Sequence, residues 1–145
     1  MSVRDNVNRE QAKIAKGALE QVCSGAQLHC LAQYYSPRFV DHVNDSEFRG
    51  HAGVQTSVNQ YRKILSNITI AVEDQVIEGQ RVVSRFVVSG AAYGRHVRFN
   101  GITISHMEDS LVVEDWSVTD TLGMLRQLGM WRLLLVMLRG LGSRP

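Results

Sequence analysis

VVEDWSVTDTLGMLRQLG, residues 112–129, is an alternating segment that passes directly into a helical one. Alternate residues of a strand share a face. One face is therefore expected to carry Val112, Glu114, Trp116, Val118 and Asp120. A carboxyl group that borders an apolar face is desolvated, and a raised pKa would make Asp120 an acid or base near neutral pH. The alternative is that Asp120 caps the helix that begins at Thr121, because Asp is a preferred cap.

Three more alternating segments precede this one. They span residues 67–79, 80–94 and 95–109. The short, turn-rich connections between them favour antiparallel hairpins over crossover connections. Together with the last segment they predict a four-stranded antiparallel meander.

Helical spacing dominates the first half of the chain. Apolar residues recur at helical intervals over 8–23, 26–34 and about 50–66. Pro37 disfavours a helical residue before it, so a loop is expected to begin at YYSPRFVDH, residues 34–42. Helices followed by a meander predict an α+β fold, in which three helices pack on a curved, mainly antiparallel sheet and leave a conical cavity open at one end.

The composition is that of one globular domain. The chain has 145 residues, of which 44% are hydrophobic and 21% charged, and its formal net charge is +2. Basic residues are scattered among acidic ones, so a nucleic-acid partner is not expected. We expect a single domain over 1–145, with its core over about 8–129 and an apolar extension over 130–145.

Three further features favour a cytoplasmic location. The first residues are polar and do not resemble a secretory signal. The longest apolar run, at 130–138, is interrupted by Arg132 and falls short of the roughly 20 residues that span a membrane. Cys23 and Cys30 have no second metal-type pair and are expected to be reduced, buried thiols.

Four stretches, taken together, resemble one known family. They are GHAGVQ (50–55), VEDQVIEGQRVVSRF (72–86), VRFNGITISHMED (97–109) and the stretch 112–129. They resemble the SnoaL-like polyketide cyclases, which belong to the nuclear transport factor 2-like superfamily, over roughly residues 8–129. The most distinctive part is the last one, in which V-E-x-W precedes D-x-L-G-M-L-x-Q-L-G.

This resemblance implies a fold, a reaction and a site. The fold is a cone-shaped α+β barrel. The family's cyclases close a ring of an antibiotic precursor by an intramolecular aldol reaction, without metal or organic cofactor. Their acid/base aspartate falls on Asp120, and a histidine that assists it falls on His106. The implied substrate is a polycyclic aromatic polyketide or another hydrophobic carbonyl compound, and we expect a homodimer formed through the outer face of the sheet.

Other side chains are candidates for substrate binding. Trp116 is expected to form a wall for a flat substrate, with simple core packing as the alternative. The remaining candidates are Tyr35, His42, Asn44, His51, Arg85 and Met124. No metal site is expected, because the stretch DHVND at 41–45 lacks the spacing of known zinc motifs.

Two alternatives to a cyclase stay open. Arg85 lies among apolar residues, where a buried Arg needs a partner such as Asp74. A pocket with this pair and a second Asp would suit water activation, so an epoxide hydrolase or isomerase of the same superfamily is the enzymatic alternative. The other is a protein that binds a small molecule or dimerises without catalysis, since fold does not determine function.

Overall fold

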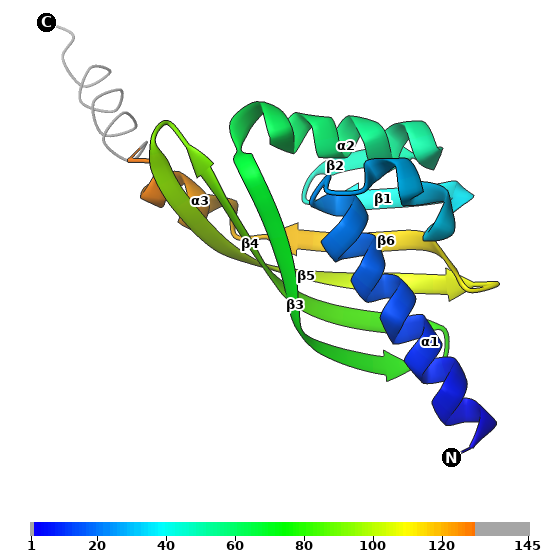
Figure 1. The fold of residues 1–145 in the computed structure, drawn as a ribbon. Coiled ribbons are helices and arrows are strands. Elements are labelled where there is room, and N and C mark those ends of the chain that lie inside the picture. The colour runs from blue at the N-terminus through cyan, green and yellow to red at the C-terminus, as the bar shows by residue number, and fades with distance from the viewer. Residues whose placement is uncertain (1, 130–145) are drawn as a thin grey trace, which may run out of the picture.

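Figure 1 shows helices packed over one curved sheet. The computed structural model describes residues 2–129. The elements, in chain order, are α1 (Val3–Gly17), the π-helix η1 (Ala18–Cys23), the 3-10 helix η2 (Leu28–Gln33), β1 (Tyr35–Val43), β2 (Ser46–Arg49), α2 (Gly50–Ile64), β3 (Ser66–Glu78), β4 (Arg81–Ala92), β5 (Arg95–Glu108), β6 (Leu111–Thr119) and α3 (Thr121–Gln127).

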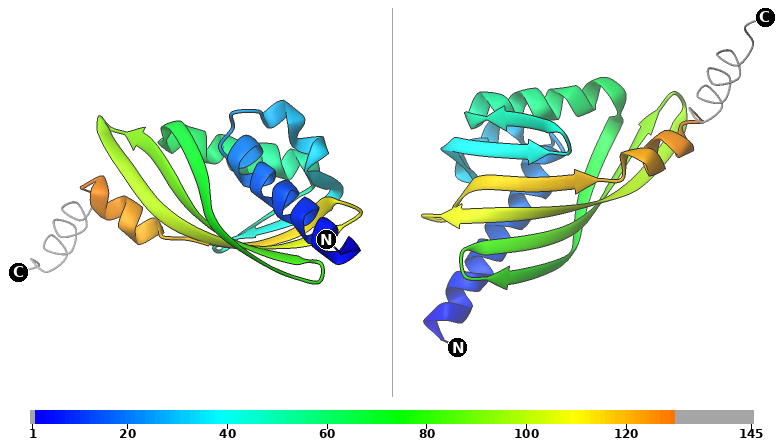
Figure 2. Two further views of the ribbon diagram at one scale, coloured as in Figure 1. Left: turned by 60° about the horizontal axis from the view of Figure 1, so that its bottom comes forward. Right: turned by 180° about the vertical axis from the view of Figure 1, so that it is seen from behind.

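The sheet has six strands in the order β2-β1-β6-β5-β4-β3 and does not close on itself. Neighbours from β6 to β3 pair antiparallel, so the predicted meander is confirmed. β1 pairs with β2 antiparallel but with β6 parallel, which makes the sheet mixed. α1 and α2 lie on its concave side (Figure 2). The predicted class, α+β with helices on a curved and mainly antiparallel sheet, is confirmed.

The helices differ from the predicted ranges at their ends. α1 begins at Val3 because Ser2 and Asp5 form a capping box, in which each side chain bonds the other's backbone amide. It then widens into η1 before the chain turns. The predicted second helix is only a single 3-10 segment, η2.

The loop predicted from residue 34 onward is wrong. That stretch forms β1, and β2 follows it. Pro37 is tolerated because the pairing of β1 with β6 shifts register between Tyr35 and Val40, so Pro37 lies in the irregular part of the ladder. Tyr35 and Phe39 anchor this part in the core, where their ring centroids lie 4.5 Å apart.

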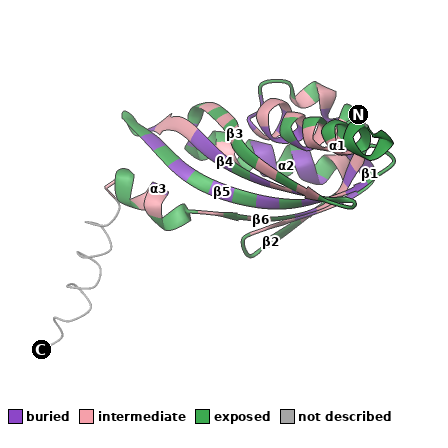
Figure 3. Ribbon diagram, turned by 90° about the horizontal axis from the view of Figure 1, so that it is seen from below, coloured by how far each residue is buried: buried purple, intermediate pink, exposed green. Residues whose placement is uncertain are grey.

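Two apolar clusters fill the space between helices and sheet. One contains Val22, Tyr35 and Phe39, and the other contains Leu19, Phe86 and further residues of β4, β5 and α3. Along β5 every second residue is buried, which Figure 3 shows as alternating colours. Several of the buried side chains on the sheet are polar: Asp41, Ser84, Thr103, Ser105 and Asp115. The concave face therefore includes a polar region as well as an apolar core.

Gly101 of β5 lets the ring of Phe86 lie directly on the strand. A Cβ atom at Gly101 would collide with that ring, and the two residues face each other in the β4–β5 register. We expect Gly101→Ala to destabilise the protein by about 1–3 kcal/mol through overpacking. Urea unfolding measures the change. The double variant with Phe86→Leu should recover part of the loss, and unchanged stability of Gly101→Ala would contradict the contact.

No helix in residues 2–129 is both long and apolar enough to cross a membrane. Cys23 and Cys30 are free thiols, as predicted, and both are half-buried. The expected apolar extension at 130–145 lies outside the described residues.

Candidate active site

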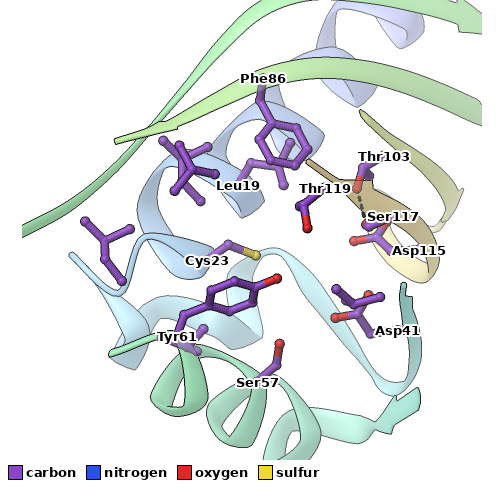
Figure 4. A pocket seen from close by; sticks show the side chains of 15 residues that line it. Leu19, Cys23, Asp41, Ser57, Tyr61, Phe86, Thr103, Asp115, Ser117 and Thr119 are labelled. Carbon is purple, nitrogen blue, oxygen red and sulfur yellow. Dashed lines mark hydrogen bonds between the residues drawn. The ribbon is translucent and has the colours of Figure 1, made fainter. Parts of the chain in front are cut away.

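A pocket opens between the concave face of the sheet and the helices η1 and α2 (Figure 4). Its volume is about 70 Å³. Apolar side chains form most of its wall, among them Leu19, Phe86 and Val88. Its polar lining consists of Cys23, Asp41, Ser57, Tyr61, Thr103, Asp115, Ser117 and Thr119. The pocket thus combines an apolar wall with two carboxyl groups.

Parallel pairing of β1 and β6 brings these two carboxyl groups together. Asp41 and Asp115 are register partners on adjacent strands, which lie roughly 4.8 Å apart in a sheet. Both are nearly inaccessible, at 9% and 5% exposure. Oδ1 of Asp115 is buried and has no hydrogen-bond partner among the described residues. No Lys or Arg lies among the residues that line the pocket, so neither carboxylate has a cation there.

Burial raises the pKa of both aspartates. It raises the pKa of Asp41 to about 7, an effect that His42 offsets in part. Burial likewise raises the pKa of Asp115 to about 8, helped by the charge of Asp41 and opposed by a hydrogen bond from Ser105. Two adjacent carboxyl groups in an apolar pocket share protons rather than ionise together. Near neutral pH the pair therefore offers one carboxylate and one carboxylic acid.

A cysteine and two tyrosines in and behind the pocket wall stay neutral near pH 7. The Sγ atom of Cys23 lies 3.2 Å from the hydroxyl of Tyr35. Burial raises the pKa of Cys23 to about 12 and that of Tyr35 well above its usual value, so neither acts as a base or nucleophile at neutral pH. Burial also raises the pKa of Tyr61, whose side chain projects from α2 into the same space as the two aspartates in Figure 4.

A second pocket adjoins the first and has a volume of about 230 Å³. Four residues line both pockets: Val43, Ser57, Tyr61 and Thr119. Two of the predicted substrate-binding residues, Asn44 and Met124, line this second, outer pocket. Asn44 has a positive φ of 50° and is held by hydrogen bonds of 3.1 Å in both directions with Thr119. The smaller pocket is called the inner pocket below.

Residues 13–128 match the family model of the SnoaL-like polyketide cyclases. The chain belongs to this family. The match covers both strands that carry the aspartate pair and most of the residues that line the two pockets. It confirms the family predicted from the sequence motifs. No curated protein matches the chain.

Solved structures show the same fold. A proposed polyketide cyclase from Bacillus cereus ATCC 10987 has a TM-score of 0.77 and 25% identity, over 90% of this chain and 86% of its own. IdmH, a proposed polyketide cyclase from Streptomyces antibioticus, has a TM-score of 0.72 and 23% identity, over 82% of this chain and 98% of its own. A protein with a ketosteroid isomerase-like fold from Catenulispora acidiphila, in complex with trimethylamine, has a TM-score of 0.72 and 13% identity, over 81% of this chain and 92% of its own.

Asp120 of this SnoaL-like chain caps a helix. Its Oδ1 accepts a hydrogen bond of 2.8 Å from the amide of Gly123, in the first turn of α3. Asp120 is exposed and does not line either pocket. The capping alternative is therefore confirmed, and Asp120 is exposed rather than desolvated.

His106 and Trp116 lie on the outer face of the sheet. An extra residue in β6, Val113, shifts the register between the Met107 and His106 pairs, so Val112 faces the core while Trp116 faces out. Trp116 is 57% exposed and is not a pocket wall. His106 pairs with Glu114, whereas the amide of Asp120 bonds Asn100, so His106 and Asp120 lie roughly 20 Å apart along β5 at the rise of a strand. The strand pairing thus keeps the two predicted catalytic residues apart.

Arg85 does not form the predicted pair with Asp74. Its guanidinium group bonds Glu73, which also contacts Arg98, and half of the Arg85 side chain is exposed on the outer face. Arg85 is Asp74's register partner, but the pairing shifts between Val72 and Asp74 and brings the Glu73 side chain within reach instead. The hydrolase alternative therefore lacks its Asp–Arg–Asp pocket.

Three other predicted binding residues have structural contacts outside the pocket lining. His42 stacks on Trp116 with ring centroids 3.8 Å apart and bonds Glu114 at 3.0 Å. Tyr35 is buried in the core behind Cys23. His51 bonds the carbonyl oxygen of Tyr35 at 2.8 Å.

The sequence reasoning missed the aspartate pair. In the sequence Asp41 stands out only as part of the DHVND stretch at 41–45, and Asp115 is not among the predicted site residues. One signal could have found Asp115. The residues that share its face near the end of β6, Ser117 and Thr119, are small and polar, which is typical of a strand that borders a cavity.

Proposed function

We propose that the chain is an acid/base enzyme of the cyclase type, which acts on a hydrophobic carbonyl compound with Asp41 and Asp115 as its catalytic pair. The observation that carries the proposal is the register pairing of these two buried carboxyl groups in an apolar pocket, without a cation in the lining. Clustered groups with perturbed pKa values in a cleft are typical of active sites.

An intramolecular aldol closure needs one ionised and one protonated carboxyl group. The ionised Asp41 removes a proton from the carbon next to one carbonyl group of the substrate. That carbon attacks a second carbonyl carbon, and the protonated Asp115 delivers its proton to the oxygen that becomes a hydroxyl. One C–H bond and the π bond of the second carbonyl group break while one C–C bond and one O–H bond form, without a leaving group. The proton that Asp41 has taken up then passes to Asp115, which restores the pair. The apolar wall keeps water from the enolate.

The pH dependence of proton transfer tests this assignment. The test reaction is exchange of the α-hydrogens of butan-2-one in D₂O, followed by NMR, in which Asp41 acts as the base and the protonated Asp115 donates a hydrogen bond to the oxygen of the enolate. The rate should rise as Asp41 ionises around pH 7 and fall as Asp115 ionises around pH 8, which gives a narrow bell. A rate that climbs steadily with pH, as for hydroxide alone, would contradict the proposal.

The catalytic roles that the resemblance implies for Asp120 and His106 stay predictions. The same exchange assay separates them from the proposed pair. Under the present proposal Asp120→Asn keeps the exchange rate within about twofold of the wild type, since only a cap is altered and Asn also caps helices. A loss with Asp120→Asn as large as that with Asp115→Asn would return the role to Asp120.

The homodimer predicted from the sequence is also proposed here, through the outer face of the sheet. Exposed apolar side chains lie side by side there on β5 and β6: Ile102 (45%), Ile104 (42%), Trp116 (57%) and Val118 (62%). A contiguous apolar patch of this kind marks association sites. Trp116→Glu should therefore lower the mass measured by light scattering from dimer to monomer. Val7→Glu, which alters an exposed residue of α1, is the control, and a monomeric wild type would refute the dimer.

The non-enzymatic alternative is a protein that binds a small molecule without catalysis. A ligand recovered unchanged, together with no exchange by the wild type at any pH, would favour it. The cytoplasmic location stays a prediction.

A further inference from the structure

We infer that the substrate presents a narrow, open-chain carbonyl end to Asp41 and Asp115, and that its bulkier part stays in the outer pocket. The inference rests on the proposed function, because it assumes that the reaction takes place at these two aspartates. It defines the shape of the substrate at each pocket.

The inner pocket is too small for a ring. Its volume is about 70 Å³. An apolar protein cavity that takes up benzene measures about 150 Å³. An aromatic ring therefore does not fit beside the two carboxyl groups, whereas a methyl ketone or a short acyl chain does.

The walls of the inner pocket are held by the core. Leu19, Phe86 and Val88 line it and are 4–5% exposed within one packed cluster. The ring of Phe86 lies on Gly101, so it has no room to move back toward β5. Close-packed interiors change volume only at a cost in stability, so the narrow shape is a property of the fold.

The outer pocket suits the rest of the molecule. Its volume is about 230 Å³, and it combines the apolar side chains of Phe48 and Phe99 with the polar side chains of Asn44 and Gln60. Tyr61 is one of the four residues that line both pockets, so its side chain lies at the boundary between them. The matching substrate has a larger body with oxygen functions, joined to the narrow carbonyl end.

Two ketones with the same number of carbon atoms test this shape. In 4-phenylbutan-2-one the ring is joined to an open methyl ketone, whereas in 2-tetralone the ketone is part of a fused ring. The experiment measures α-hydrogen exchange of each in D₂O with the full chain, and divides each rate by the uncatalysed rate. Asp115→Asn defines which part of the exchange depends on the site.

The open-chain ketone should exchange at least about tenfold faster than 2-tetralone after this correction. Phe86→Leu, which widens the inner pocket, should reduce that ratio by about fivefold or more. Phe39→Leu is the matched control, since Phe39 is equally buried but lies in the other cluster and does not line the pocket. It should leave the ratio unchanged, and thermal melting confirms that both variants fold.

The outcomes separate the inference from the proposed function. Asp115-dependent exchange at equal corrected rates for the two ketones, or a ratio that Phe86→Leu leaves unchanged, overturns the inference while the proposed function stands. If neither ketone shows Asp115-dependent exchange, the proposed function fails. The inferred shape is then tested by binding, in an NMR titration that follows the amides of Thr103 and Thr119. Tighter binding of 4-phenylbutan-2-one than of 2-tetralone supports the inferred shape, and equal or tighter binding of 2-tetralone overturns it.

Discussion

Asp115→Asn is expected to lower the rate of ketone α-hydrogen exchange by about 10²- to 10⁴-fold, the usual contribution of a positioned acid or base. Asn has nearly the same shape as Asp but cannot supply the carboxylic acid proton. Asp115 is buried, and Asp41, which acts as the base, is the only other carboxyl group among the described residues that line the pocket. The measurement is the exchange rate of butan-2-one at the optimal pH.

The matched control is Asp109→Asn. Asp109 is exposed in the turn between β5 and β6, where its φ of 49° is one that Asn readily adopts. This variant should exchange at the wild-type rate. Equal rates for Asp115→Asn and Asp109→Asn, with both proteins folded, would show that Asp115 is not catalytic.

Stability should fall as pH rises from about 4 to about 9, which is the second large effect. Burial sets the folded pKa values of Asp41 and Asp115 at about 7 and about 8, above the ordinary value of 3.8. A raised folded pKa means that the folded state binds the proton more tightly than the unfolded chain does. The contribution is fully present below about pH 4 and is lost as pH rises through the two folded pKa values. At about 1.4 kcal/mol per pKa unit, the loss amounts to several kcal/mol.

Urea unfolding at a series of pH values measures this loss. The double variant Asp41→Asn with Asp115→Asn has no group left to ionise at the site, so its stability should vary much less over the same range. The difference between the two curves isolates the pair from the other titrating groups. Parallel curves, or a wild type that gains stability relative to the variant as pH rises, would contradict the burial of the two carboxyl groups.

The strands of the meander could be predicted because their signals are local. Each alternates over a stretch long enough to be recognised, and each hairpin connects neighbours in sequence. β1 could not be predicted in the same way. Its parallel partner, β6, lies some 70 residues further along the chain, and Pro37 argues against regular structure at short range. Pairing with a distant strand overrides that local signal.

The error at Trp116 has a physical cause in β6. The alternation over residues 112–120 predicts one continuous face, but the extra residue Val113 reverses which side chains face the helices. Trp116 and Val118 are apolar, as core residues are, and yet they are exposed on the outer face. The cap at Asp120 was within reach of the sequence because it depends on a residue only three positions away.

The sequence by itself determined the α+β class, the order of helices and meander, and the family, since all of these depend on local periodicity and contiguous motifs. Only the tertiary structure decided which face of the sheet the helices cover, and hence that Asp41 and Asp115 meet in a buried pocket. Two residues so far apart in the chain become neighbours through the β1–β6 pairing alone. Their pKa values are raised by the packing of helices over that face, which no short stretch of sequence encodes.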